Sequence, residues 1–345
     1  MKHFNLNTNK LCIFAFSGLL LLSSCNHNPL KIDVSGIQVT PVKIDRLEKD
    51  MFTMPPDSVS KYTPILTKKY GKFYSDLVIR FLNDGGTVDS TYAQSLKRFI
   101  RDKDMRSAYD SCEKIYPDMA FLESGLTDAF RHFKYYFPDS SLPRVVSVMT
   151  GFNYSLIYDD KTLAVSLERY LGQGSLFYTM LQYPHYKTMR MRRDNLLCDA
   201  VYGWLESLFK SNEDKNDMLA AIVHEGKIMY LEDALLPDAA DTLKMGYSAK
   251  QLNWCKDNEF NMWAYIIQQK ILYSTDQSEI TKFTNDGPFT AGFNRDFSPA
   301  RTGNWLGWQL VRAYMKNNPS VTLAQLMAEK NADFILQRSG YKPTK

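Results

Sequence analysis

The sequence predicts an α+β protein that is mostly helical and contains one small antiparallel sheet. Over most of the 345 residues, apolar side chains recur at every third or fourth position, as they do in helices that cover a core. Between positions 144 and 167 the pattern changes to short apolar runs separated by turn residues, which is typical of strands. The length is sufficient for one large domain or two small ones.

The pattern predicts the elements in the following order. Residues 37–42 favour an edge strand at best, because Pro41 interrupts the alternation of Ile37 and Val39. Residues 61–137 have the apolar spacing of helices. A meander of three short antiparallel strands follows, at 144–150, 154–158 and 163–167. Further helices are expected at 195–210, 215–236, 248–273 and 302–317.

The first residues have the features of an export signal. A basic start with Lys2 precedes an apolar run of 12 residues, which is too short for a transmembrane helix of about 20 residues. Leu22-Ser23-Ser24-Cys25 then matches a bacterial lipobox, in which the cysteine receives a diacylglyceryl group and becomes the acylated N-terminus. We therefore expect lipidation of Cys25 and attachment to the membrane through its acyl chains, such as palmitate.

This signal sets the expected domain organisation. Residues 1–24 are the signal peptide, residues 25–36 a lipid-anchored tether and residues 37–345 a single mostly helical domain. Cleavage removes two lysines and no acid, so the formal charge falls from +4 to +2 and indicates no nucleic-acid partner. The remaining cysteines show no CxxC or paired spacing and are expected to be buried thiols; they are Cys112, Cys198 and Cys255.

One short segment raises the question of a metal site. The sequence AAIVHEGKIMYLEDALLPD, at 220–238, begins like the HExxH motif of zinc peptidases. In that motif two histidines one helical turn apart bind zinc, and the glutamate is the general base. Here His224 and Glu225 are present, but Ile228 stands where the second histidine belongs and has no lone pair to offer.

The number of ligands argues against a working zinc site. A catalytic zinc needs three protein ligands and one open position. His224 is one ligand and Glu259 is a candidate for a second, which leaves the set one short. We therefore expect no cofactor, a neutral His224 packed in a buried helix, and Glu225 as a capping or pairing carboxylate. The alternative is a metal-dependent peptidase with an altered ligand set.

Two groups of residues are candidates for interaction. A basic cluster, suited to lipid headgroups or an acidic partner but equally to a solvated face, consists of Arg190, Arg192 and Arg193. Trp305 and Trp308 share one face of a predicted helix, where core packing and a binding interface are the two explanations. The chain contains no GxSxG and no Walker A motif, so neither chemistry is indicated.

Five separated blocks then follow one another in a recognisable order. They read VSLERYLGQGSLFY, GKIMYLEDALLPD, NMWAYIIQQKILYSTD, PFTAGFNRDFSPARTGNWLGWQLVRAYM and ILQRSGYKP. Together with the lipobox, they resemble the gliding-motility lipoprotein GldB family of Bacteroidota over about residues 35 to 342. More distantly, that family is similar to predicted zinc peptidases with HExxH helices, which implies a zincin-like ancestry for the fold.

The resemblance implies an envelope lipoprotein, held by its lipid at the outer membrane. The implied role is that of a non-catalytic component of the machinery for gliding motility or type IX secretion, with other envelope proteins as partners. A general periplasmic lipoprotein without a motility role is a further alternative. The residues after Cys25, NHNPLK, contain no acidic surface-export signal, which favours the periplasmic face.

Overall fold

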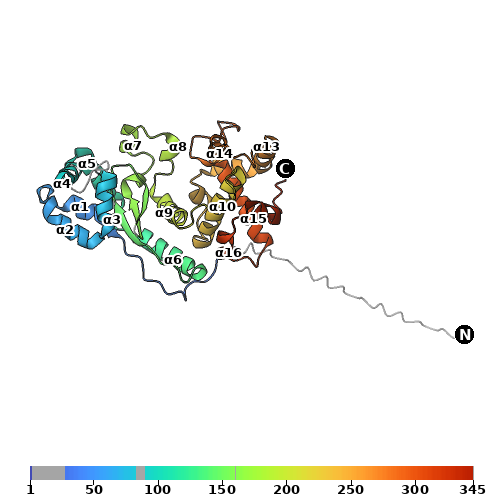
Figure 1. Ribbon diagram of the computed structural model, residues 1–345, viewed down its shortest axis with the longest axis horizontal. Helices are drawn as coiled ribbons and strands as arrows, with labels where there is room; N and C mark the ends of the chain where they lie inside the picture. Colours follow the sequence, from blue (N-terminus) through green and yellow to red (C-terminus); the bar gives the residue numbers. More distant parts are fainter. Residues whose placement is uncertain (2–27, 83–89, 160, 345) are drawn as a thin grey trace.

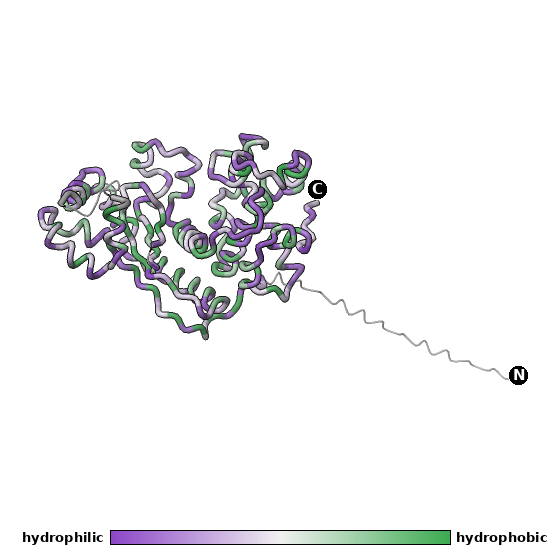
Figure 2. The backbone as a smooth tube through the Cα atoms, viewed as in Figure 1, coloured by the Kyte–Doolittle hydropathy of each residue, from purple (hydrophilic) through white to green (hydrophobic). Residues whose placement is uncertain are grey.

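The computed structural model describes Met1 and residues 28–82, 90–159 and 161–344, so the lipobox and Cys25 lie outside the described part (Figure 1). The described residues share one extensive apolar core. Hydrophobic stretches follow the central strands and helices, whereas hydrophilic stretches prevail in the outer segments (Figure 2). None of the helices in these ranges combines the length and the apolar character that a membrane crossing needs.

The first half of the described chain is helical and surrounds the start of the sheet (Figure 1). Strand β1 spans Asp45–Arg46, so the chain is not a strand at 37–42, where the sequence predicted one. The reason is that side chains of helix α6 (Ala120–Tyr136) bind this backbone: Thr127 Oγ1 accepts from Val42 N at 2.8 Å and Glu123 Oε1 accepts from Ile44 N at 2.9 Å. The helical elements are α1 (Leu47–Thr53), η1 (Pro56–Ser58), α2 (Val59–Tyr70), α3 (Lys72–Asp76), η2 (Leu77–Leu82), α4 (Ser90–Arg101), α5 (Lys103–Ile115) and α6 (Ala120–Tyr136).

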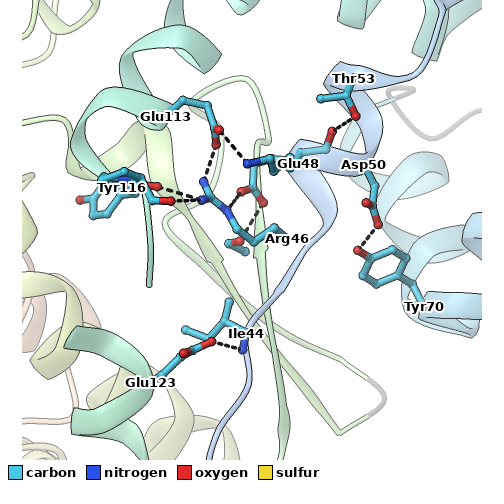
Figure 3. Close-up of polar contacts among 12 residues, drawn as sticks. Ile44, Arg46, Glu48, Asp50, Thr53, Tyr70, Glu113, Tyr116 and Glu123 are labelled. Atoms are coloured by element: carbon cyan, nitrogen blue, oxygen red, sulfur yellow. Dashed lines mark hydrogen bonds and ion pairs between the residues drawn. The ribbon is translucent and has the colours of Figure 1, made fainter. Parts of the chain in front are cut away.

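A group of charges around the buried Glu48 joins β1 and α1 to their neighbours (Figure 3). Arg46 donates from Nε to Glu48 Oε1 at 2.8 Å and from Nη2 to Glu113 Oε1 at 2.6 Å. Glu48 is fully buried and also accepts from Ser147 Oγ at 2.7 Å. Burial raises the pKa of Glu48, and the hydrogen bonds from Arg46 and Ser147 oppose that rise. These contacts fix the N-terminal segment on the body of the protein.

The sheet confirms the α+β class but not the predicted antiparallel meander. Its strand order is β1-β2-β4-β3, with β2 at Arg144–Val148, β3 at Leu156–Asp159 and β4 at Thr162–Ser166. Strand β2 pairs in parallel with both β1 and β4, and only β3 is antiparallel to β4, so the sheet is mixed. The physical reason lies in burial: β4 is buried at every position and β2 at all but its first, as is typical of central parallel strands.

The second half of the chain consists of further helices. One long helix was predicted at 248–273, but the structure has two, which meet at Asn258. The Asn258 side chain donates to Trp254 O at 2.9 Å and thereby ends the first helix. The elements are η3 (Leu167–Tyr170), α7 (Leu176–Met180), α8 (His185–Thr188), α9 (Arg193–Leu208), α10 (Met218–Leu235), α11 (Asp241–Met245), α12 (Ala249–Asp257), α13 (Glu259–Gln268), α14 (Gln277–Thr284), α15 (Thr302–Asn317), α16 (Leu323–Ala328) and α17 (Ala332–Ser339).

Helix α10 lies in the interior of this half and crosses α15 at very short range (Figure 1). The crossing needs glycine on both helices, because a Cβ on Gly307 would meet Ile222 O at 1.7 Å and one on Gly226 would meet Gly307 O at 2.2 Å. The two glycines therefore allow the backbones to touch, and they set the position of the HEGKI segment on α10.

Candidate functional site

The structure places His224 beside an ion pair and not beside other metal ligands. Its Nδ1 lies 3.5 Å from Glu213 Oε1, and the Lys227 Nζ lies 2.6 Å from the same oxygen. Burial alone would raise the pKa of Glu213, but hydrogen bonds from His224 and Lys227 hold it well below its ordinary value. Ile228, at the position of the second histidine in the motif, is fully buried in the core.

Glu225 is held by neutral groups of two neighbouring helices. Its Oε2 accepts from the Tyr202 hydroxyl of α9 at 2.7 Å and from Asn304 Nδ2 of α15 at 3.1 Å. Burial raises the pKa of Tyr202 well above its ordinary value, and the charge of Glu225 adds to the rise. In this arrangement the carboxylate joins α9, α10 and α15 at one point.

Glu259, the candidate second ligand, has a different partner. It begins α13 and accepts from the Tyr341 hydroxyl at 2.6 Å. In the described ranges, no three histidine, cysteine, aspartate or glutamate side chains come close enough together to share a metal ion. The described cysteines Cys112, Cys198 and Cys255 are free and buried.

The predicted basic cluster divides when the chain folds. Arg190 turns inward, and its Nη2 lies 3.1 Å from Asp199 Oδ1. Arg192 and Arg193 are exposed, the first bonded to Asn195 at 2.9 Å and the second placed 4.1 Å above the ring of Phe121. The three guanidinium groups therefore do not form one surface patch.

Trp305 and Trp308 are core residues and do not form an exposed surface. Their side chains are 1% and 0% exposed, and their rings pack edge to face with centroids 5.9 Å apart. Trp308 Nε1 donates to Asp233 Oδ2 at 2.8 Å, and the guanidinium of Arg312 stacks on the Trp308 ring at 3.6 Å. Of the two explanations that the sequence left open, the structure favours core packing.

A polar cleft that was not predicted lies next to Tyr202. It is a cleft of about 720 Å³ between strand β3 and helices α8 and α9, with Asp286 on its rim. Its wall includes Ser155 and the first three residues of the strand, 156–158, together with the side chains of Arg169, Lys187, Arg190, Asp199, Tyr202 and Glu206. A volume of this size is in the range of ligand pockets.

The charged groups of this cleft differ in how they are satisfied. Arg190 pairs with Asp199, and although burial disfavours its charge, Asp199 and Asp286 raise its pKa above the ordinary value. Arg169 is engaged by Ser155 Oγ at 3.0 Å and by the carbonyl of Phe152 at 3.0 Å. No ion pair with a described residue joins Lys187 or Glu206, and burial and the nearby Glu225 raise the pKa of Glu206.

The sequence holds no local signal for this cleft. Its residues come from β3, η3, the segment around α8, and α9, which tertiary packing brings together. Arg169 and Tyr170 lie in one of the quoted blocks, VSLERYLGQGSLFY, but nothing in that block points to a cavity. A second, less polar groove of about 1010 Å³ lies next to the first described residues, where Leu30, Ile32, Tyr135 and Met315 are among the lining side chains.

Helix α10 carries a further buried polar residue, Glu232. Glu232 is fully buried, and neither of its carboxylate oxygens has a hydrogen-bond partner among the described residues. Burial raises its pKa well above the ordinary value, and the charges of Lys244 and Arg190 oppose the rise only partly. Burial therefore favours the protonated form of Glu232 over the carboxylate.

Comparison with known proteins identifies the family of this chain. The family model described as gliding motility protein GldB matches residues 27–343, which is nearly all of the chain after the lipobox. No curated protein and no solved structure matches it. Because the matched region contains the sheet, the cleft and α10 alike, the chain belongs to the GldB family of gliding-motility lipoproteins.

Proposed function

We propose that this protein is a lipid-anchored, non-catalytic component of the envelope machinery for gliding motility and the associated type IX secretion. Acylated Cys25 anchors it in the outer membrane on the periplasmic side, and other envelope proteins are its partners. The family supports a motility-related lipoprotein. The observation that carries the non-catalytic part is the environment of the HEGKI segment.

In that segment each group that zinc chemistry would use is already occupied. Glu213 and Lys227 adjoin His224, Tyr202 and Asn304 bind Glu225, and the position of the missing histidine is a buried isoleucine. A zinc ion at His224 would lie near the Lys227 ammonium, and like charges repel in a site of low dielectric constant. The same proposal includes a zincin-like ancestry of α10, but not a zinc-dependent activity.

The contacts of the first described residues support a short anchor. Asn28 Nδ2 donates to Pro237 O at 3.2 Å, and Lys31 Nζ lies 2.5 Å from Asp238 Oδ1. Two residues separate Cys25 from Asn28, and three residue steps span at most about 11 Å. The lipid therefore holds the surface around Pro237, which includes the less polar groove, close to the membrane.

The first experiment tests the non-catalytic role. The full-length protein is purified without chelator as wild type, His224→Ala and Glu225→Gln, and bound zinc and peptide hydrolysis are measured. The expected result is no stoichiometric zinc, and full complementation of a deletion strain by Glu225→Gln. Zinc that is lost only in His224→Ala, or hydrolysis that is lost only in Glu225→Gln with the fold intact, establishes the peptidase alternative.

The second experiment tests anchoring and partnership. Cells that express the wild type or Cys25→Ala are fractionated, crosslinked and analysed for proteins that co-purify with the lipoprotein. We expect the variant to leave the membrane fraction, to lack the mass of the lipid and to lose its envelope partners. A variant that keeps its membrane location and mass refutes lipidation, and recovery of no motility or secretion protein with the wild type favours a general periplasmic lipoprotein.

A further inference from the structure

Strand β3 forms one edge of the sheet and also one wall of the cleft. In the described part of the chain it pairs with β4 alone, because the strand order ends at β3. Its residues Leu156 to Tyr158, and Ser155 directly before them, line the cleft of about 720 Å³. An edge strand presents backbone N–H and C=O groups that lack ladder partners and that another extended chain can bind.

The register shows which backbone groups of β3 point away from β4. Ser166 N donates to Ser155 O at 2.9 Å, which marks these residues as a hydrogen-bonded antiparallel pair. Hydrogen-bonded and non-bonded pairs alternate along an antiparallel ladder. The pairs of Leu156 with Val165 and of Tyr158 with Leu163 are therefore non-bonded, and the N–H and C=O groups of Leu156 and Tyr158 point away from β4.

The wall of the cleft opposite β3 carries charged side chains. Helix α9 packs against the strand at Gly203, where a Cβ would come within 2.7 Å of a Leu156 methyl group, and residues of both elements line the cleft. Glu206 on α9 and Lys187 on α8 line the cleft without a described ion-pair partner, whereas Arg190 and Asp199 neutralise one another. The unpaired acid and base suit a chain that carries side chains of both signs.

From this juxtaposition we infer that the cleft binds an extended segment of a partner polypeptide, which adds as a strand to β3. Backbone hydrogen bonds to Leu156 and Tyr158 hold the segment, and a basic side chain of the segment pairs with Glu206. Peptide recognition of this kind takes affinity from the main chain and specificity from the flanking pockets. The inference rests on the proposed function, because it assigns a binding mode to a component that acts by association.

A matched pair of variants tests the strand edge. Tyr158→Pro and Tyr158→Ala both remove the phenol, but only proline removes the outward N–H, which the sheet itself does not use. The full-length protein in detergent is first used to select binders from a display library of random linear peptides. Selected peptides are then titrated against both variants, and we expect binding to be at least about tenfold weaker for Tyr158→Pro than for Tyr158→Ala.

A second measurement leaves the protein unchanged and holds even if Tyr158→Pro does not fold. Each backbone nitrogen of a selected peptide is methylated in turn, and we expect alternate positions to abolish binding while the others do not, because alternate residues of a strand face the partner. No enriched peptide, equal loss at all methylated positions, equal affinity of two folded variants, or a dimer that forms through β3 would each overturn the inference.

The same variants separate this inference from the proposed function. Crosslinking in cells is repeated with Tyr158→Pro after its fold has been checked by circular dichroism. If Tyr158→Pro keeps its envelope partners, and the peptides bind it as well as the wild type or show no detectable binding at all, the cleft inference is refuted and the envelope role stands. If the wild type itself recovers no envelope partner, the proposed function fails whatever the peptides do.

Discussion

Glu48 and Glu232 are both completely buried, but the protein treats the two carboxyl groups differently. Glu48, in the N-terminal half, accepts hydrogen bonds from Arg46 and Ser147 at 2.8 and 2.7 Å (Figure 3). Glu232, on α10, has no hydrogen-bond partner among the described residues, and its pKa rises well above the ordinary value because of burial. Hydrogen bonds from neighbours favour the charged form of Glu48, whereas burial disfavours the charged form of Glu232.

Glu48 has a structural role, whereas the packing around Glu232 does not require a carboxyl group. The bonds of Glu48 connect α1 to β2, and they account for its presence. A buried carboxyl group without a hydrogen-bond partner costs free energy relative to an apolar side chain of the same shape. Groups of this kind concentrate at functional sites, and Glu232 shares α10 with Glu225, which binds Tyr202 at the wall of the cleft.

The largest expected loss of stability comes from forcing α10, the helix that carries Glu232, away from α15. In Gly307→Ala the new methyl group would lie 1.7 Å from Ile222 O, so α10 and α15 must separate. We expect a loss of about 3 kcal/mol or more in the free energy of unfolding, measured by denaturant titration. Gly174→Ala is the control, because nothing lies within 4 Å of its Cβ position. Equal stability of both variants would show that the helices are not held by this contact.

A smaller loss in the free energy of unfolding is expected when Glu48 is changed. Glu48→Gln removes the charge that Arg46 and Ser147 bind but keeps the shape of the side chain. Arg46 retains its bond to Glu113, so we expect a loss of about 2–3 kcal/mol, the contribution of hydrogen bonds to a charged group, in the same unfolding experiment. A change near zero would mean that Glu48 is no better compensated than Glu232, and the contrast between them would disappear.

An effect of opposite sign, and the smallest of the three for each pH unit, is expected at Glu232. Its folded-state pKa lies above the ordinary value of 4.5, so the folded state binds the proton more tightly than the unfolded state. The wild type therefore loses stability as the pH rises above that ordinary value, by up to about 1.4 kcal/mol per pH unit until the folded-state pKa is reached. Glu232→Gln cannot ionise, so its stability relative to the wild type should increase with pH. Parallel curves of stability against pH would contradict this prediction.

The sequence alone determined the local and repetitive features of this protein. Helical spacing located α9, α10 and α15 to within a few residues, because a helix is specified by side chains three and four positions apart. The missing histidine at Ile228 and the order of the quoted blocks were also sequence properties, and the family match agrees with the block order. Lipidation of Cys25 stays a prediction, because this residue lies outside the described part of the chain.

Only the tertiary structure decided how these elements meet. The position of β4 between β2 and β3 depends on pairing across the sheet, and a strand sequence does not state which neighbour it will have. The basic residues at 190, 192 and 193 are adjacent in sequence, yet Arg190 turns to Asp199 while Arg192 and Arg193 face solvent. The cleft exists because β3, η3 and α9 converge, and contacts between segments so far apart are set by the packing of the whole core, which no local pattern records.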